Sequence, residues 1–277
     1  MNEKLSAEQV QSYREHGILF PIRVLDAAAT TAFQAAFDSM ELHEGPLKYL
    51  PHPHLFFPWA HELAIHPTVI QAVEEIIGPE LLVESTVILA KYPADGLFVP
   101  WHQDGEYSGW YKTPSVSAWI ALTDSDRQNG CMRVIPGSHR RRQPHRQRIY
   151  PNSLFQRTTE IEVKVDEDLA SDVELKAGEF SLHHSSIIHG SSPNRSNTRR
   201  VGFVVRFVTP AFQSRVHQHP VVRARGTGDC GLLPLLAAPP SGELEECWAS
   251  WRAAFPLSSH AYLNQSTTEA TGERQGR

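Results

Sequence analysis

A series of short strand-like segments in the middle of the chain constrains its fold more than any other feature. Each segment is rich in β-branched or aromatic residues, and Gly, Pro, Asn or Asp separates it from the next. Helical segments do not alternate with them, so the pattern favours a double-sheet jelly roll over a parallel α/β sheet. The expected strands cover residues 82–90, 98–104, 116–123, 131–135, 160–165, 172–176, 179–183 and 201–208.

Helix signals gather on either side of these strands. Before residue 80 the chain has a capping-box pattern, a second capping residue and a proline suited to a first helical position. Between residues 42 and 59 it is rich in Pro, His and aromatic residues, which predicts an irregular loop. The expected helices run from Ser6-Ala7-Glu8-Gln9 to near Gly17, over 27–40 after Asp26, from Pro67 to Ile77, and over 241–255 with Leu244, Trp248 and Trp251 on one stripe.

Together these signals predict a mainly β protein with flanking helices: a double-stranded β-helix behind a helical N-terminal cap. We expect one domain over residues 1–263, with the cap at about 1–80, the jelly-roll core at about 81–210 and a C-terminal extension over 211–263. The polar segment 264–277 has the composition of a disordered tail. The sequence contains no internal repeat.

Composition narrows the possible functions. The formal net charge of −5 argues against a nucleic-acid partner, because that function needs a basic surface. No apolar run is long enough to span a membrane, and residues 1–4 lack the apolar core of a signal peptide. The three cysteines are far apart in the sequence, which favours a reducing cytoplasm over a disulfide framework. We therefore expect a cytoplasmic protein, a monomer or weak homo-oligomer, without a nucleic-acid or membrane partner.

A histidine and a carboxylate lie two residues apart in the segment Trp101-His102-Gln103-Asp104-Gly105. If a strand runs through this segment, His102 and Asp104 project to the same side. One imidazole and one carboxylate on one face are two of the three ligands of the facial triad that holds non-haem Fe(II). The third ligand is expected to be a histidine much later in the chain, on a strand that the barrel brings close.

Several later segments resemble the phytanoyl-CoA dioxygenase family, in the expected order from about residue 6 to 210. That family consists of Fe(II)- and 2-oxoglutarate-dependent oxygenases on a double-stranded β-helix. The matching segments are 116–122 with Trp119, Asn129-Gly130-Cys131, Pro136-Gly137-Ser138-His139, His189-Gly190-Ser191, Pro193-Asn194-Arg195-Ser196 and Arg199-Arg200.

In the family, an arginine eleven residues after the distal histidine binds the far carboxylate of 2-oxoglutarate. Two pairs have this spacing here, His189 with Arg200 and His184 with Arg195. Arg195 lies in a turn-like segment where its side chain would be solvated, whereas Arg200 opens a strand that can hold a guanidinium rigidly. We also expect Gly202 on the same face to leave room for the co-substrate. We therefore predict His189 as the third metal ligand and Arg200 as the cofactor-binding arginine.

The resemblance suggests further co-substrate contacts, each with a structural alternative. Trp119 matches a position near the cofactor, and it could equally be a core tryptophan. Ser191 could donate to a cofactor carboxylate or cap the turn. Val87 and Lys48 correspond to family contacts, although the alignment of Lys48 crosses the irregular loop. Arg206 shares the face of Arg200, so it either pairs with a protein carboxylate or anchors an acidic substrate.

The basic run 139–146 is expected to be a solvated surface loop, with a lid over an anionic substrate as the alternative. The resemblance implies that His102, Asp104 and His189 hold Fe(II), and that 2-oxoglutarate and O2 are co-substrates in the hydroxylation of an unactivated C–H bond. The family's halogenases have a small residue in place of the carboxylate, so Asp104 favours hydroxylation. The alternatives are a cupin-like metal enzyme that does not use 2-oxoglutarate and a non-catalytic binding or sensor protein on the same fold.

Overall fold

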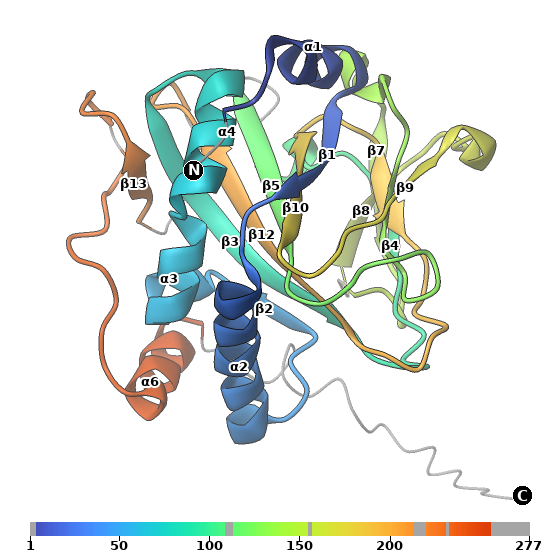
Figure 1. Cartoon of the computed structure of the whole chain (residues 1–277). Coiled ribbons are helices and arrows are strands. Elements are labelled where there is room, and N and C mark those ends of the chain that lie inside the picture. Colours follow the sequence, from blue (N-terminus) through green and yellow to red (C-terminus); the bar gives the residue numbers. More distant parts are fainter. Residues whose placement is uncertain (1–3, 109–112, 155–156, 213–219, 231–232, 256–277) are drawn as a thin grey trace, which may run out of the picture.

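Two antiparallel sheets of unequal size face each other, and helices cover the outer side of the larger one (Figure 1). The computed structural model describes residues 4–108, 113–154, 157–212, 220–230 and 233–255. The larger sheet has the order β1-β10-β5-β12-β3-β13, with β2 paired to β3, and the smaller has the order β4-β11-β6-β9. This architecture is the predicted double-stranded β-helix with N-terminal helices.

The strand bounds differ from the expected ones mainly at their ends. Several strands were not predicted, namely β1, β2, β7, β11 and β13, and the strand predicted over 160–165 lies earlier in the chain, as β8. The strands are β1 Ile18–Arg23, β2 Tyr49–Pro51, β3 Leu81–Lys91, β4 Val99–His102, β5 Ser115–Ala121, β6 Met132–Val134, β7 His145–Ile149, β8 Arg157–Ile161, β9 Ser171–Val173, β10 Glu179–His184, β11 His189–Ser191, β12 Arg200–Val208 and β13 Val222–Arg225.

Three of the helices, α1, α2 and α4, begin where the capping signals place them. The Ser6 capping box is present, the Asp26 side chain accepts from the Ala29 amide at 2.8 Å, and Pro67 is the first residue of α4. The α-helices are α1 Ala7–His16, α2 Ala27–Glu44, α3 Pro58–Ala64, α4 Pro67–Ile77, α5 Gly105–Ser108 and α6 Leu244–Ala254, and the 3-10 turns are η1 Pro53–Leu55, η3 Ser138–Arg140 and η4 Glu167–Leu169.

The prediction of an irregular loop over 42–59 was wrong, because this segment contains β2, η1 and the start of α3. Here Pro53 and Pro58 each occupy a first helical position. The prolines that suggested a loop therefore start helical turns. The predicted tail 264–277 lies outside the described residues, and the proposed division of residues 1–263 stays a prediction.

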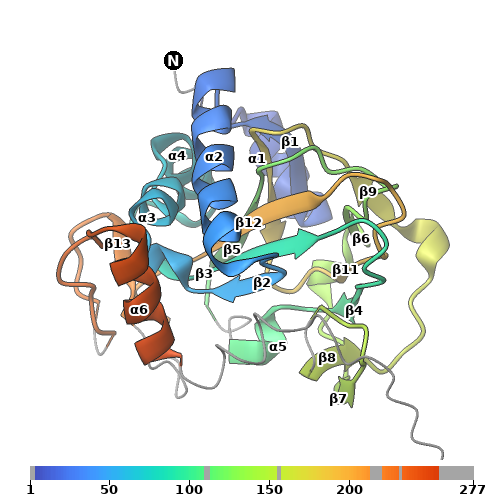
Figure 2. The same cartoon turned by 90° about the horizontal axis from the view of Figure 1, so that it is seen from below.

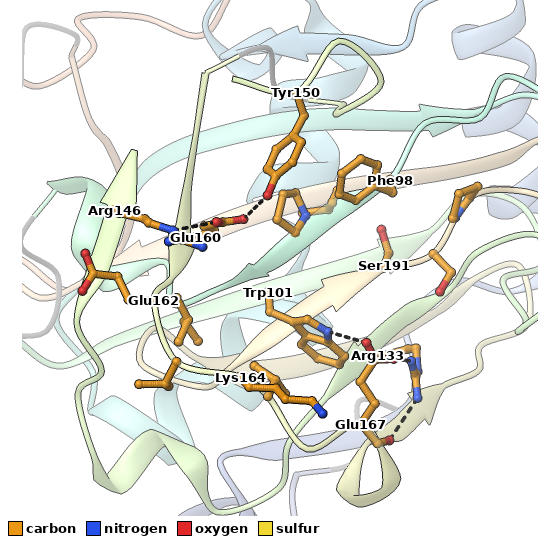
Figure 3. Close-up of a pocket in the computed structure, with 17 residues that line it drawn as sticks. Phe98, Trp101, Arg133, Arg146, Tyr150, Glu160, Glu162, Lys164, Glu167 and Ser191 are labelled. Atoms are coloured by element: carbon orange, nitrogen blue, oxygen red, sulfur yellow. Dashed lines mark hydrogen bonds and ion pairs between the residues drawn. The ribbon is translucent and has the colours of Figure 1, made fainter. Parts of the chain in front are cut away.

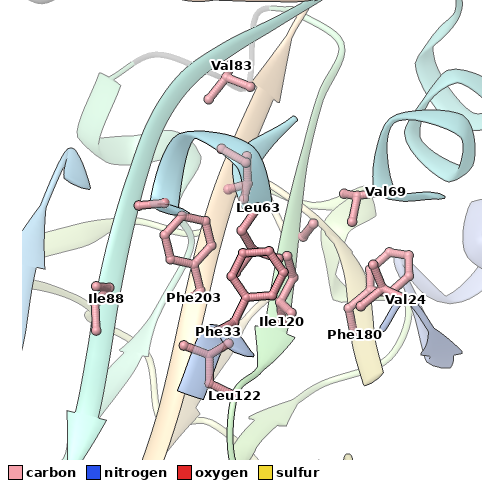
Figure 4. Packing of buried hydrophobic residues seen from close by; sticks show 14 of the residues in the cluster. Val24, Phe33, Leu63, Val69, Val83, Ile88, Ile120, Leu122, Phe180 and Phe203 are labelled. Atoms are coloured by element: carbon pink, nitrogen blue, oxygen red, sulfur yellow. The ribbon is translucent and has the colours of Figure 1, made fainter. Parts of the chain in front are cut away.

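The larger sheet separates two hydrophobic clusters. Alternate residues of β12 such as Phe203 and Val205 pack against the helices, together with Phe33 of α2 and Leu63 of α3 (Figure 4). Val204 instead joins the cluster between the two sheets. Figure 2 shows α2, α3 and α4 on one side of this sheet and β4, β11 and β6 on the other. The polar residues of the site lie in the layer between the two sheets.

The late helix α6 packs as its apolar stripe predicts. Trp248 and Trp251 are fully buried, and the Trp251 indole donates to the Pro51 carbonyl at 2.9 Å. The three cysteines are buried and free. Within the described residues, no helix combines the length and apolar character needed to cross a membrane.

Candidate metal centre and its cavity

Three side chains from two neighbouring strands converge between the sheets. His102 ends β4, His189 begins β11, and these two residues face each other in the antiparallel register. The His102 Nε2 atom lies 3.5 Å from Asp104 Oδ1, and the His189 Nε2 atom lies 4.0 Å from the same oxygen. One ligand atom from each of the three buried residues lies within 4.8 Å of the others, as one metal ion requires.

Asp104 reaches this cluster by a different route from the one predicted. The strand β4 ends at His102, and the chain then turns into the short helix α5, so Asp104 is not on a strand. The Gly105 amide donates to the Ser185 carbonyl at 2.8 Å, which ties the turn to the segment after β10. The tight turn, and not strand alternation, brings Asp104 beside His102.

The hydrogen bonds of both histidines direct their Nε2 atoms toward the cluster. His102 Nδ1 lies 2.9 Å from the Pro100 carbonyl, and His189 Nδ1 lies 3.0 Å from the Ile187 carbonyl. A carbonyl can only accept, so Nδ1 carries the proton in the neutral ring and Nε2 keeps a lone pair. Each imidazole is therefore oriented as a metal ligand by its own backbone two residues earlier.

The two oxygens of Asp104 have different surroundings. Oδ1 faces the two ligand histidines, whereas Oδ2 lies 3.5 Å from the Arg206 Nε and 3.8 Å from the His183 Nε2. The Ser117 hydroxyl also donates to Oδ2, at 3.4 Å. The protein thus occupies one oxygen and leaves the other facing the cluster, which suits a carboxylate that binds a metal through one atom.

The charges in the cluster favour metal binding at neutral pH. Burial alone would raise the pKa of the Asp104 carboxyl, but Arg206 and the His102 and His183 imidazoles hold that pKa well below its usual range. Burial, with His102 beside it, lowers the pKa of His189 well below its usual value. Metal ligands must be deprotonated, so both shifts favour the ligand forms.

The three residues open onto a cavity between the sheets that contains two arginines of β12. Apolar side chains form much of its wall, and Arg200 and Arg206 stand at separate positions on the same strand face. The cavity is lined by Leu89, Val99, His102, Asp104, Trp119, Met132, His183, His189, Gly190, Ser191, Arg200, Val204 and Arg206.

Arg200 is 2% exposed and lies over the ring of Trp119, with its guanidinium carbon 5.2 Å from the ring centroid. Its Nε has no hydrogen-bond partner and it makes no ion pair within the described residues. Burial lowers its pKa to about 10, so it is still charged at neutral pH. Arg199, its neighbour, instead pairs with Asp38 and Glu41 on α2.

The predicted purpose of Gly202 was wrong. An added Cβ at this position would lie 2.0 Å from Cζ2 of Trp119, so the glycine makes room for the tryptophan and not for the co-substrate. The indole packs against the backbone of β12 and supports the Arg200 guanidinium from below. Trp119 is therefore a core residue of the inner cluster that also lines the cavity, and its contact with the co-substrate stays a prediction.

Of the other predicted co-substrate contacts, Ser191 lines the cavity and Val87 and Lys48 do not. Ser191 lines the cavity, and its hydroxyl accepts a 2.6 Å hydrogen bond from the Lys91 ammonium. Val87 is buried in the inner cluster opposite Val204, and the cavity wall on β3 is formed by Leu89 instead. Lys48 accepts from the Ala90 amide through its carbonyl, and it does not line the cavity. The co-substrate roles of these residues stay predictions.

The competing pair His184 and Arg195 lies away from the cavity. The His184 ring lies beside that of His139, tilted by 47° with the centroids 5.1 Å apart, and burial lowers the pKa of His184 to about 4. Arg195 is exposed, as its turn-like sequence predicted.

Two residues that line or support the site were missed from the sequence. His183 faces the cavity because it alternates with the inward-facing Ser181 on β10, and its Nδ1 is buried without a hydrogen-bond partner. Lys91 is the last residue of β3 and pairs with Arg200 in the register. Strand alternation could have found both: His183 is two residues after Ser181, and Lys91 is two residues after Leu89.

A larger cavity of about 550 Å³ lies on the outer face of the smaller sheet (Figure 3). Trp101 and Arg133 point into it, on the side opposite His102 and Val134. Both arginines that line it are paired with acids that also line it: Arg133 contacts Glu167 at 2.6 Å, and Arg146 contacts Glu160 at 2.9 Å. The cavity meets the metal cluster's cavity only at Val99 and Ser191, which line both.

Part of the basic run 139–146 is bound to the motif that holds the metal ligands. The buried Gln103 side chain donates to the Arg141 carbonyl at 3.0 Å and accepts from the Gln143 amide at 2.9 Å. Arg142 forms an ion pair with Glu106, with Nη2 and Oε2 2.6 Å apart. This segment is therefore fixed beside the site, and the charge of Arg142 is compensated there by Glu106.

The residues present fit an Fe(II) ion and 2-oxoglutarate. Two neutral imidazoles and one carboxylate make the donor set of a facial triad, and the buried guanidinium of Arg200 lacks a protein counter-charge. A dicarboxylic 2-oxo acid could bind the metal at one end and neutralise Arg200 at the other.

The fold and the triad together define a non-haem iron oxygenase of the double-stranded β-helix class. The family model of phytanoyl-CoA dioxygenase (PhyH) matches residues 5–202, so the chain belongs to that family. It is accordingly an Fe(II)- and 2-oxoglutarate-dependent dioxygenase of this family, with His102, Asp104 and His189 as the metal triad. The family acts on small-molecule substrates.

Relatives share the architecture at modest identity. The chain is 27% identical over 239 residues to peroxisomal phytanoyl-CoA dioxygenase of Bos taurus, covering 74% of this chain and 69% of the relative. It is 27% identical to a probable alpha-ketoglutarate-dependent hypophosphite dioxygenase of Stutzerimonas stutzeri, where it covers 56% of this chain and about half (54%) of the relative. The solved apo structure of the non-heme monooxygenase ThoJ superposes with a TM-score of 0.72 at 29% identity, over 93% of this chain and 98% of that one.

Proposed function

We propose that the protein hydroxylates an unactivated C–H bond of a small molecule, with conversion of 2-oxoglutarate and O2 to succinate and CO2. The observation that carries this proposal is the complete triad with its carboxylate in place, in one cavity with a buried arginine that has no protein counter-charge. When bound, iron and 2-oxoglutarate supply the oxidation: one atom of O2 enters succinate and the other enters the product.

The chain's own residues hold and orient these groups. His102, Asp104 and His189 are the metal ligands, and Arg200 binds the distal carboxylate through its planar guanidinium. Trp119 keeps that guanidinium in place, and Ser191 offers a hydroxyl to the same end of the cavity. The apolar wall around them limits access of water and of other reductants.

Asp104 supports hydroxylation over halogenation. A carboxylate at this position occupies the place that a halide would need, and here Arg206, His183 and Ser117 all fix it. The same oxidising chemistry could desaturate or cyclise a substrate that is held differently, so the product decides between these outcomes.

The chemical class of the substrate has weaker support. Arg206 lines the cavity beside the metal ligands, which favours a polar or anionic group in the substrate. However, its guanidinium already faces Asp104, and Arg142 and Arg146 of the basic run have acidic partners. We therefore favour a polar small molecule over a strongly anionic one. The relatives' names mention substrates as different as phytanoyl-CoA and hypophosphite.

The first test needs no substrate. Anaerobic addition of Fe(II) and 2-oxoglutarate to the full chain should produce a weak charge-transfer band in the visible range, and His102→Ala should abolish it. No band in the wild type, or an unchanged band in His102→Ala, would contradict the proposal and favour a cupin-like enzyme or a binding protein. A screen of metabolite mixtures for substrate-dependent succinate release, followed by the mass of the product, then identifies the reaction.

A further inference from the structure

A buried lysine lies directly behind the part of the cavity that Arg200 lines. Lys91 ends β3, pairs with Arg200 in the antiparallel register and is 0% exposed. Its ammonium donates to the Ser191 hydroxyl and to the Ser192 carbonyl, both at 2.6 Å. A side chain as long and as charged as lysine is rarely buried completely without a reason in its surroundings.

The charges around Lys91 do not balance within the protein. Within the described residues, neither Lys91 nor Arg200 makes an ion pair with a carboxylate. The Asp95 carboxylate raises the pKa of both Lys91 and Arg200 from a distance. Its two oxygens already accept hydrogen bonds from the Tyr92 and Leu97 amides. Burial and the nearby Arg200 lower the pKa of Lys91 well below its usual value. An anion bound beside these two buried basic side chains, neither of which contacts an acid in the described chain, would therefore be stabilised.

Ser191 transmits this charge to the cavity. An ammonium group has no lone pair, so in the Lys91–Ser191 hydrogen bond the serine oxygen must accept. The serine's own proton is then left to point elsewhere, and Ser191 lines the same cavity as Arg200. Lys91 therefore fixes and polarises a hydroxyl donor on the side of the cavity where a second carboxylate would meet Arg200.

We propose that Lys91 is a positioning residue for the distal carboxylate of the co-substrate, acting through Ser191 and beside Arg200, so that the site selects a 2-oxo acid with two carboxylates over one with a single carboxylate. This inference rests on the proposed role of Arg200. It assigns the lysine to selection of the co-substrate and not to the chemistry at the metal.

The test compares two 2-oxo acids that share the metal-binding end. 2-Oxoglutarate has the distal carboxylate and pyruvate does not, so their ratio of affinities isolates the contribution of that carboxylate. Binding of each acid is measured by titration calorimetry on the full chain loaded with Mn(II), which replaces Fe(II) without oxidising. Lys91→Met should weaken 2-oxoglutarate binding about 10- to 30-fold and pyruvate binding less than about 3-fold, since only 2-oxoglutarate has the distal carboxylate that the Lys91 side chain and the Ser191 hydroxyl it orients would stabilise.

Two further variants separate this role from a purely structural one. Ser191→Ala keeps the lysine and removes the hydroxyl through which it acts. It should therefore weaken the binding of 2-oxoglutarate by about 3- to 10-fold and leave that of pyruvate nearly unchanged. Asn194→Ala removes a hydrogen bond to the Lys91 carbonyl, at 3.2 Å, but leaves the ammonium unchanged. This matched control should leave the ratio of the two affinities within about 2-fold of wild type.

The outcomes are distinct. The proposal would be overturned if Lys91→Met weakened the binding of both acids equally, because the lysine would then only support the loop. It would also be overturned if the affinity of neither acid changed, because the lysine would then contribute nothing to binding. If Lys91→Met does not fold, the Ser191→Ala ratio decides, and an unchanged ratio there also overturns it. A wild-type protein that binds neither acid would instead refute the proposed function.

Discussion

The two inward-facing arginines of β12 are six residues apart and have opposite surroundings. Arg206 lies 3.5 Å from the carboxylate of Asp104, so its charge is compensated by the protein and helps to hold a metal ligand. Arg200 lies on Trp119 with no acidic partner in the described chain. The difference separates a part of the cavity that the protein completes by itself from a part whose charge balance requires a ligand.

Asp104→Ala removes the group on which both parts depend, and it should have the largest effect. Loss of the carboxylate takes away one of three ligands, and we expect metal affinity to fall at least about 100-fold, with loss of the Fe(II)–2-oxoglutarate absorption band. The variant should also be destabilised by about 1–3 kcal/mol without metal, because Arg206 loses one of the two acids, Asp104 and Glu84, that stabilise its charge. Metal binding by calorimetry and urea denaturation check the two effects. Wild-type metal affinity in this variant would contradict the assigned triad.

Arg200→Met tests directly whether the charge of Arg200 serves ligand binding and not the stability of the fold. We expect 2-oxoglutarate affinity to fall about 100-fold, since the lost group would make a bidentate, charge-assisted contact. The metal-free protein should keep its stability or gain up to about 1 kcal/mol, because an uncompensated buried charge has been removed. Metal affinity without 2-oxoglutarate should be unchanged. A large loss of stability in the metal-free protein would show that Arg200 has a structural role after all.

Arg206→Met should show the opposite pattern. The pKa of Asp104 is held below its usual value in the folded state, so the pair stabilises the fold at neutral pH and loses this contribution only as the pH falls through that lowered pKa. Removing Arg206 should therefore cost about 2–3 kcal/mol at pH 7 in the metal-free protein. It should also make metal binding weaken at a higher pH than in wild type, because Asp104 is then more easily protonated. Thermal unfolding and metal titrations at pH 5–8 measure both, and a pH profile identical to wild type would refute the role given to Arg206.

The sequence predicts the fold and the metal triad better than the contacts between the residues that surround the triad. The strand pattern and the capping residues depend on local chemistry, and they predict the fold. His189 was chosen as the third ligand by the spacing to Arg200 that the family resemblance implies, and the structure places it with His102 and Asp104. Asp104 was assigned correctly for a wrong reason, because a turn and not a strand presents it. Local patterns do not report which strands become neighbours, so the pairing of Lys91 with Arg200 and the approach of Trp119 to Gly202 became visible only in the structure.

Gly202 lies between the two arginines, and Gly202→Ala tests whether the two parts of the cavity are independent. The added methyl would lie 2.0 Å from the Trp119 ring, so the indole must move, at an expected cost of about 1–3 kcal/mol in stability. Because that indole supports the Arg200 guanidinium, 2-oxoglutarate affinity should fall about 3- to 10-fold, while metal affinity at the Asp104 end stays within about 2-fold of wild type. Calorimetric titration of metal, and then of 2-oxoglutarate, separates the two values. Equal losses in both would show that the strand transmits the disturbance along its length, and unchanged 2-oxoglutarate binding in a destabilised variant would reduce Trp119 to a packing residue.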